Sequence, residues 1–276
     1  MGRKSLVGVW FLSSFLVHSS ASAIECSSEY FLYGSQTLTI GDRATVSHGS
    51  IGAGTLAQLG VGTHVQGTLV ADSITLANNA ILNGSVFTNH PVSSQAGAKI
   101  FGQVLPVTPG LLCTSPAVPT LTPGGQDIFV EGTVELPPGQ YGHIDVAPHS
   151  TLIVSSGAYA FKVVIFEPDS RLVGVWKGAP ASLFVTEGIM FGDRHRQTAA
   201  RSSDNANSRA AISIYSLQQQ QLRLGTDSTI ISQIIAPFAE VNVPPRAVVN
   251  APLYGRIVHI EPDATIGAFT QPNACQ

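Results

Sequence analysis

A short phrase recurs along this chain of 276 residues, and it constrains the fold more than any other feature of the sequence. In each copy an aliphatic residue leads into a turn, usually through Gly, Pro or Glu-Pro. A small polar pair follows, and then a second aliphatic run. Neighbouring copies about 20 residues apart are typical of a solenoid built from stacked repeats. The copies are Ile40–Val46, Leu76–Leu82, Val146–Leu152, Phe166–Leu172, Leu224–Ile230 and Ile260–Ile266.

The stretches around these copies indicate short strands. Residues 38–88 alternate apolar and small polar side chains, as half-buried strands do, and they show no helical period. The same pattern resumes over residues 126–185. Glycines between the runs supply the positive-φ corners that a tight coil needs. We therefore expect an all-β fold, a single-stranded parallel β-helix (β-solenoid) with right-handed coils.

Two segments break this pattern. Residues 89–126 contain six prolines, and proline is a poor strand residue because it cannot donate a hydrogen bond to a neighbouring strand. We expect a long Pro-rich surface loop there, lying along the solenoid and held by Cys113. Residues 192–209 carry four arginines and scarcely an aliphatic side chain. We expect them to form a polar insertion between coils.

The first residues have the pattern of a secretory signal peptide. A basic start at Arg3 and Lys4 precedes the apolar residues 6–17, and small residues at 21–23 form a cleavage site. The apolar run is well short of the roughly 20 residues that span a bilayer. We therefore expect a secreted, periplasmic or cell-surface protein without a membrane span after cleavage. Its parts are a signal peptide at 1–23 and a β-solenoid domain at 24–276.

Charged side chains make up only 11% of the chain, against about 25% in typical soluble domains. Acidic residues outnumber basic ones, with 17 Asp and Glu against 14 Lys and Arg, and the signal peptide would remove two of the basic residues. Such a surface lacks the basic stripe that neutralises phosphates. We expect no nucleic-acid partner.

The three cysteines are Cys26, Cys113 and Cys275. Export permits disulfides, but an odd number leaves at least one thiol free or paired between molecules. Cys26 and Cys275 sit at opposite ends of the mature chain, so we expect an extended solenoid to hold them far apart. We predict one disulfide that involves Cys113, and its partner is open between the other two.

Several phrases carry a family resemblance. Leu136–Gly142 and Ser155–Phe161 resemble a motif pair of uncharacterised exported bacterial β-helix proteins, and Ala236–Asn242 with Leu253–Val258 resembles their closing coils. The N-terminal third is similar to the coils of bactofilin-like, polymer-forming solenoids. The resemblance implies a β-helix and self-association, and its motifs contain no catalytic residue. Bactofilins are cytosolic, and the signal peptide departs from that pattern.

Candidate catalytic groups are few. Most acids occur one per turn, where Asp usually caps the turn through its own backbone. The best local cluster is Asp193, His195 and Arg196, from which a general base and a binder of acidic sugars can be assembled. His143 and His149 lack a third ligand for a metal site. We expect no metal and no cofactor.

These observations favour an exported structural or adhesive β-helix protein of the cell envelope or surface, without catalytic activity. An uncapped terminal coil exposes a strand edge, so the solenoid ends are candidate sites of self-association. The alternative is a carbohydrate-active or carbohydrate-binding β-helix, similar to polysaccharide lyases, that uses residues 192–209 to engage a surface polysaccharide. A flat ice- or surface-binding face would need ranked threonines, and Thr37 and Thr39 alone fall short of that.

Overall fold

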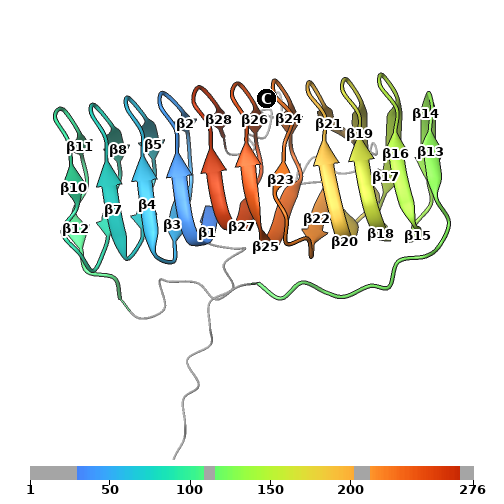
Figure 1. Ribbon diagram of the computed structural model, residues 1–276, viewed down its shortest axis with the longest axis horizontal. Helices are drawn as coiled ribbons and strands as arrows, with labels where there is room; N and C mark the ends of the chain where they lie inside the picture. The colour runs from blue at the N-terminus through green and yellow to red at the C-terminus, as the bar shows by residue number, and fades with distance from the viewer. Residues whose placement is uncertain (1–29, 109–115, 202–211, 268–276) are drawn as a thin grey trace, which may run out of the picture.

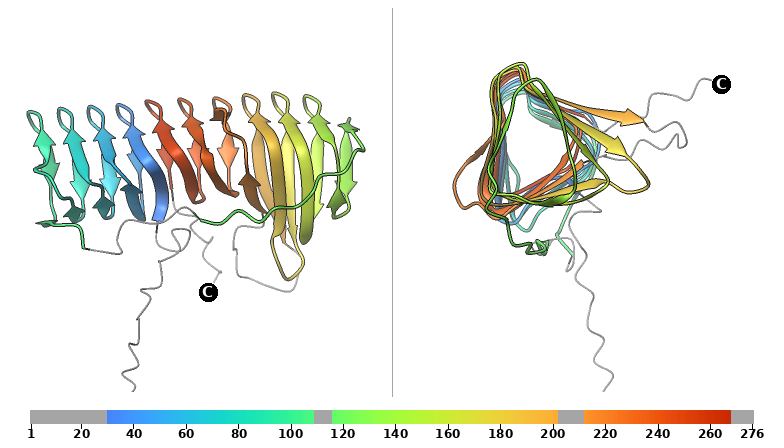
Figure 2. Two further views of the ribbon diagram at one scale, coloured as in Figure 1. Left: turned by 60° about the horizontal axis from the view of Figure 1, so that its bottom comes forward. Right: turned by 90° about the vertical axis from the view of Figure 1, so that its right-hand side faces the viewer.

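The computed structural model describes residues 30–108, 116–201 and 212–267, and within these ranges it contains strands and no helix. The coils stack in a single row (Figure 1), and Figure 2 shows their triangular cross-section end-on. Every strand pairing is parallel. The expected parallel β-helix is therefore confirmed, while its handedness stays a prediction. No helix that could cross a membrane occurs in the described ranges.

The strands form two sheets, of 17 and 11 strands. The larger sheet contains β1 (Tyr30–Ile40), β3 (Ser50–Ala53), β4 (Leu56–Leu59), β6 (Leu69–Val70), β7 (Ser73–Leu76), β9 (Val86–Phe87), β10 (Ser93–Ser94), β12 (Val104–Leu105), β13 (Ile128–Val130), β15 (Gly139–Gln140), β16 (His143–Val146), β18 (Gly157–Phe166), β20 (Ala181–Phe191), β22 (Ile212–Ser216), β23 (Leu222–Arg223), β25 (Gln233–Val243) and β27 (Leu253–Ile260). The smaller sheet contains β2 (Thr45–Val46), β5 (His64–Gln66), β8 (Ile81–Asn83), β11 (Lys99–Ile100), β14 (Thr133–Leu136), β17 (Thr151–Ser155), β19 (Arg171–Trp176), β21 (Arg196–Arg201), β24 (Thr229–Ile230), β26 (Val248–Val249) and β28 (Thr265–Ile266).

The larger sheet wraps around two sides of the triangle, and the smaller sheet forms the third. Strand β1 shows the wrapping, because its first part pairs with β3 and its second part pairs with β4. Apolar side chains alternate inward along every side and fill the interior. Phe166 and Phe191 of adjacent coils, for example, stack there with ring centroids 5.3 Å apart and almost no exposure. Each coil thus buries against its neighbours what it could not bury alone.

The first described strand, β1, lies in the middle of the solenoid rather than at one end (Figure 1). Residues 30–105, here called the N-terminal half, build outward from β1 to the end coil β10–β12. Residues 128–266, the C-terminal half, start at the opposite end coil, β13–β15, and build back to the middle. There β27 pairs with β1, and β28 pairs with β2. We call this contact between the first and last coils of the chain the seam.

The seam corrects one expectation about the chain ends. We expected an extended solenoid to hold the two ends of the mature chain far apart. In the structure the first described strand is paired with the strand before the last one, because the coil order is circularly permuted relative to the sequence. Cys26, Cys113 and Cys275 themselves lie outside the described residues, so the predicted disulfide stays a prediction.

The Pro-rich segment also starts later than expected. Residues 93–105 form the three short strands β10, β11 and β12, which pair with β7, β8 and β9. A loop that begins at residue 89 is therefore wrong, and only residues 106–127, the crossover segment, connect the two ends of the solenoid. Its described part from residue 116 runs along the outside toward β13, as we expected (Figure 1).

The polar segment 192–209 also begins inside a coil. Gly192 to His195 form a corner, and Arg196–Arg201 form β21, which pairs with β19 through six residues. We expected an interruption of the coils from residue 192. Residues 192–201 belong to a regular coil instead, and residues 202–209 lie outside the described residues. Arg196 faces outward, and the buried Gln197 accepts hydrogen bonds from the Ile231 and Ser232 N–H groups, so this strand lacks the apolar alternation that would have marked it in the sequence.

An outward-facing aromatic stripe runs along the side that the crossover segment covers. Its members lie in register on neighbouring strands, except that Gly52 of β3 stands between Tyr33 and Val70, and they are mostly buried although they point away from the interior. Val107 and Val118 of the crossover segment pack on the stripe. At the seam, the rings of Tyr33 and Tyr254 stack 5.3 Å apart. The stripe consists of Phe87, Val70, Tyr33, Tyr254, Ile235, Tyr215 and Phe184.

The packing of the crossover segment on the aromatic stripe can be tested by introducing one charged residue. Val118→Asp places a carboxylate against the tyrosines, which should lower the free energy of unfolding by about 1–3 kcal/mol, the cost of a poorly solvated polar group. Urea denaturation measures this loss. Ala117→Asp is the matched control, because Ala117 is exposed, and it should change stability little. Equal effects of the two variants would show that the crossover segment does not cover the stripe.

Candidate functional site

The recurring phrase forms one corner of the triangle, and its third turn residue has an unusual backbone conformation. At this position φ is between 56° and 62° in eight coils, although none of the residues is glycine. Left-handed conformations normally cost an L-residue about 1–2 kcal/mol. In five of the eight coils the N–H of this residue donates to a carbonyl of the next coil, as from Arg43 to Val61 and from Asp263 to Asp42. The eight residues are Arg43, Asn79, His149, Asp169, Arg194, Asp227, Arg246 and Asp263.

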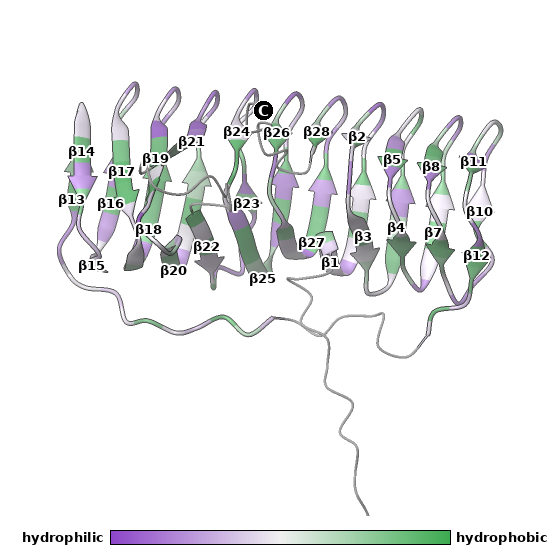
Figure 3. Cartoon of the chain, turned by 180° about the vertical axis from the view of Figure 1, so that it is seen from behind, coloured by the Kyte–Doolittle hydropathy of each residue, from purple (hydrophilic) through white to green (hydrophobic). Residues whose placement is uncertain are grey.

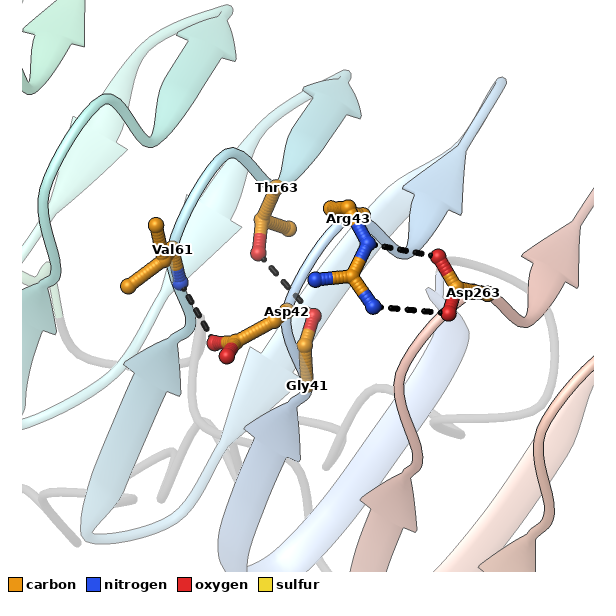
Figure 4. Close-up of polar contacts among 6 residues, drawn as sticks. All are labelled: Gly41, Asp42, Arg43, Val61, Thr63 and Asp263. Carbon is orange, nitrogen blue, oxygen red and sulfur yellow. Dashed lines mark hydrogen bonds and ion pairs between the residues drawn. The ribbon is translucent and has the colours of Figure 1, made fainter.

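Six of these eight residues form a line of alternating charge, here called the corner ladder. In spatial order they are Arg43, Asp263, Arg246, Asp227, Arg194 and Asp169. Three bidentate ion pairs hold the line together, and all their N–O distances lie between 2.6 and 2.8 Å. Figure 4 shows the pair of Arg43 and Asp263, which joins residues 220 positions apart and crosses the seam.

The ion pairs change the acidity of the carboxyl groups. A hydrogen bond from Arg43 lowers the pKa of Asp263, and Arg246 and Arg194 lower the pKa values of Asp227 and Asp169 in the same way. Carboxylates held ionised by a bidentate guanidinium are poor general acids and poor general bases near neutral pH. The corner ladder therefore has the chemistry of a structural element.

A second set of acids bonds between coils instead of capping its own turn. Asp42 accepts a hydrogen bond from the Val61 backbone N–H at 2.7 Å, and Asp193 accepts one from Thr226 at 2.9 Å. Figure 4 shows the first of these bonds. We expected Asp42 to cap its own turn, and that expectation is wrong, because its carboxylate bonds to the next coil. Because the corners are stacked, a backbone N–H of the next coil lies within hydrogen-bonding distance of each carboxylate.

The predicted cluster of Asp193, His195 and Arg196 is divided among three environments. Asp193 lies at the corner and holds Thr226. Arg196 begins β21 and faces outward beside Arg171. His195 points into the solenoid and has no exposed surface. Although adjacent in sequence, these three side chains do not converge on a common open site.

His195 occupies the position where other coils place a small inward residue such as Ala44, Ser170 or Ser228. Its Nδ1 lies 3.0 Å from the Ser170 hydroxyl, and its ring contacts Phe166 and Phe191. Its Nε2 has no hydrogen-bond partner among the described residues. Burial lowers the pKa of His195 to about 3, so the imidazole is neutral in the folded protein.

The other sequence candidates are also dispersed. His143 lies on β16 and His149 at the corner of the same coil, and no group of three potential metal ligands occurs within the described ranges. Thr45 and Thr265 are register neighbours across the seam, but His64 and Val248 follow on either side. The described threonines there form a row of only two.

A shallow groove of about 460 Å³ crosses the sheet between β20 and β23. It opens where the strand pairing is interrupted, and the buried side chain of Gln218 accepts a hydrogen bond from Ile189 N–H in place of a strand. Val163, Ile165 and Met190 line its floor, with Glu187 and Arg223 beside them. The side chains of the predicted cluster do not line this groove.

The two end coils present the clearest unsatisfied surface. Each of their strands pairs on one side only within the described residues. Large apolar side chains are exposed there: Phe101 by 67%, Val104 by 53% and Phe129 by 64%. Figure 3 shows apolar strand segments in the terminal coils as in the interior ones. Val104 continues the apolar pattern of the neighbouring coil, since its register partner is Val86, whereas Phe129 lies beside Asp145 and had no such signal in the sequence.

Comparisons with known proteins assign no family to this chain. No family model matches the chain, and no curated protein matches it. One similar solved structure is the crystal structure of an ice-binding protein from the Antarctic ascomycete Antarctomyces psychrotrophicus. The two share 13% identity over 88% of this chain and 96% of that chain, with a TM-score of 0.42.

The left-handed corners can be tested with a matched pair of substitutions. Arg246→Ala and Arg246→Gly both remove the ion pair with Asp227, but only glycine relieves the positive φ. We expect the glycine variant to be more stable than the alanine variant by about 1 kcal/mol. Urea denaturation of the two variants measures the difference. Equal stabilities would mean that the corner conformation carries no strain.

The buried imidazole predicts a pH dependence of stability. Because the folded-state pKa of His195 lies near 3 and its ordinary value is near 6.5, the unfolded chain binds more protons between these values. The stability contributed by the neutral ring is thus complete above pH 6.5 and falls by up to about 1.4 kcal/mol per pH unit below it. Denaturation of His195→Gln between pH 7 and pH 4 should show a shallower decline than the parent protein. Equal slopes for the two proteins would contradict a buried neutral ring at His195.

Proposed function

We propose that this protein is an exported structural or adhesive solenoid that assembles end to end and has no catalytic activity. The observation that carries the proposal is the state of the two end coils. Both have an unpaired strand edge in the described structure, and both expose phenylalanine side chains beside it. Unpaired edges of this kind are templates for pairing with another chain.

The two ends are also complementary in direction. All strands run parallel, so the outer edge of β10–β12 and the outer edge of β13–β15 face opposite ways along one common coil direction. A second copy placed on either end continues the solenoid without a reversal. Contacts between unlike surfaces that do not close into a ring produce open filaments.

The distribution of charge favours the same proposal. The corner ladder occupies the centre of the solenoid, and the corners of the end coil β10–β12 and its two neighbours carry Gly97, Asn79 and Gly62 instead. At the other end the corner residue is Gly132. The ends therefore approach each other without like charges at this corner.

A carbohydrate-active protein that uses residues 192–209 has less support. Its candidate base, His195, lies inside the solenoid with a lowered pKa, and Asp193 is engaged by a backbone N–H. A general base has to reach the proton that it removes. The described part of the segment does not offer such a group.

The end contacts can be tested by adding charge to both end coils. Phe101→Lys combined with Phe129→Lys should abolish assembly, because it buries a charge at each contact, while the free energy of unfolding stays within about 0.5 kcal/mol. Sedimentation velocity and electron microscopy of the mature protein report the assembly. Phe238→Lys, 51% exposed and away from the ends, is the control and should still assemble. A parent protein that stays monomeric at its highest soluble concentration would contradict the proposal.

A further inference from the structure

The seam differs from every other described coil contact in one respect: no peptide segment passes directly from one coil to the next. The coil of β27 and β28 lies against the coil of β1 and β2, yet the paired residues are about 220 positions apart. The two halves are joined only through the crossover segment at the far ends of the solenoid. The seam is therefore an interface between two separately built halves.

The chemistry of the seam is that of an ordinary coil-to-coil step. Strands β1 and β27 pair through seven residue pairs, and Gly41 N–H donates to Ile260 O at 2.7 Å. The same corner bond occurs within the N-terminal half, where Gly60 N–H donates to Ile40 O at 2.7 Å. Coil stacking thus needs matched edges and does not need a continuous chain.

Three features give the seam its specificity. The Tyr33 and Tyr254 rings stack across it on the aromatic stripe, at 5.3 Å. Arg43 and Asp263 pair across it in the corner ladder, at 2.8 Å. Leu38 and Val258, both fully buried, are register partners across it inside the solenoid. Any copy of the chain carries both faces of this interface.

We propose that the seam also forms between copies, so that the N-terminal half of one molecule docks on the C-terminal half of another. In this arrangement β1 and β2 of one copy pair with β27 and β28 of the second copy, as they do within one chain. This inference goes beyond end-to-end assembly, because the surface involved is the seam and the end coils take no part in recognition. The exchange is a domain swap, in which an intramolecular contact is re-formed between molecules.

The length of the crossover segment permits this exchange. Eleven coils at about 4.8 Å each place the end coils about 48 Å apart, whereas the 22 residues 106–127 reach about 75 Å when extended. The segment therefore spans one solenoid and still reaches a neighbour beside it. If exchange continues from molecule to molecule in a row, the segment links the end of one solenoid to the start of the next, where only a short bridge is needed.

Isotope mixing separates exchange from end-to-end contact. A protease site is inserted between Gly125 and Gln126, in an exposed part of the crossover segment of the full chain. Unlabelled and ¹⁵N-labelled copies are unfolded together, refolded together and then cut. Native mass spectrometry identifies each particle by the labels of its two halves. The end-blocked variant with Phe101→Lys and Phe129→Lys is used for both copies, so end-to-end contacts do not contribute.

Exchange predicts particles that contain one labelled and one unlabelled half, in a share approaching roughly one half, the value for random pairing of swapped halves. Copies refolded separately and mixed before cutting are the control and should give matched labels only. Co-refolded samples with no more mixed particles than this control would overturn the proposal. Halves that separate on cutting would overturn it as well, since the seam would then be too weak to hold a partner. Neither result bears on the end-coil contacts, which the parent protein reports independently.

As a second readout, one copy carries Thr39→Cys and the other carries His259→Cys. These positions are register partners on the outer face of the seam, so a disulfide between the two copies forms only when the seam joins them. The double variant in a single chain shows that the geometry allows the bond. Peptide mapping that finds the 39–259 disulfide between copies supports exchange, and its absence from co-refolded copies contradicts it.

Discussion

The parallel stacking of one coil on the next is the interaction on which the rest of this structure depends. A single coil is too thin to bury its own apolar side chains, so each must find a neighbour whose edge matches along three sides. The corner with positive φ helps to keep the sides in register, because in five of the eight coils its N–H donates to the following coil. The ion pairs of the corner ladder then join side chains that the backbone conformation at this corner has already placed in a row.

The recurring phrase was enough to predict this architecture. Its Gly, Pro and Asp residues mark the corners, and the alternating runs between them mark the sides. The end coil at 93–105 escaped prediction because its three strands are only two residues long each, too short to show an alternation of apolar and polar side chains. The corner copy that contains Arg194 was read as an insertion for a related reason. Arginine in a left-handed turn leaves no sequence signal without its partner, and that partner, Asp169, lies one coil away.

The permuted coil order was equally hidden. Every coil offers similar edges, so periodicity alone does not say which coil lies beside which. The choice depends on particular pairs such as Tyr33 with Tyr254 and Arg43 with Asp263, which are too far apart in sequence for a local pattern to connect them. His195 illustrates the same limit at a single position. A histidine in a polar segment suggested a general base, but its position in the corner places the side chain inside the solenoid, against Phe166 and Phe191.

The seam also sets the order in which the molecule is completed during synthesis. The coil that starts the chain emerges first, yet the coil that covers its open side is made last, about 220 residues later. At ordinary rates of translation this delay is on the order of 10–40 s. Throughout that time the ring of Tyr33 and the inner side chains of β1 lack their final neighbour. The last coil completes the centre of the solenoid, and the nascent chain must keep its first coil soluble until that last coil has been made.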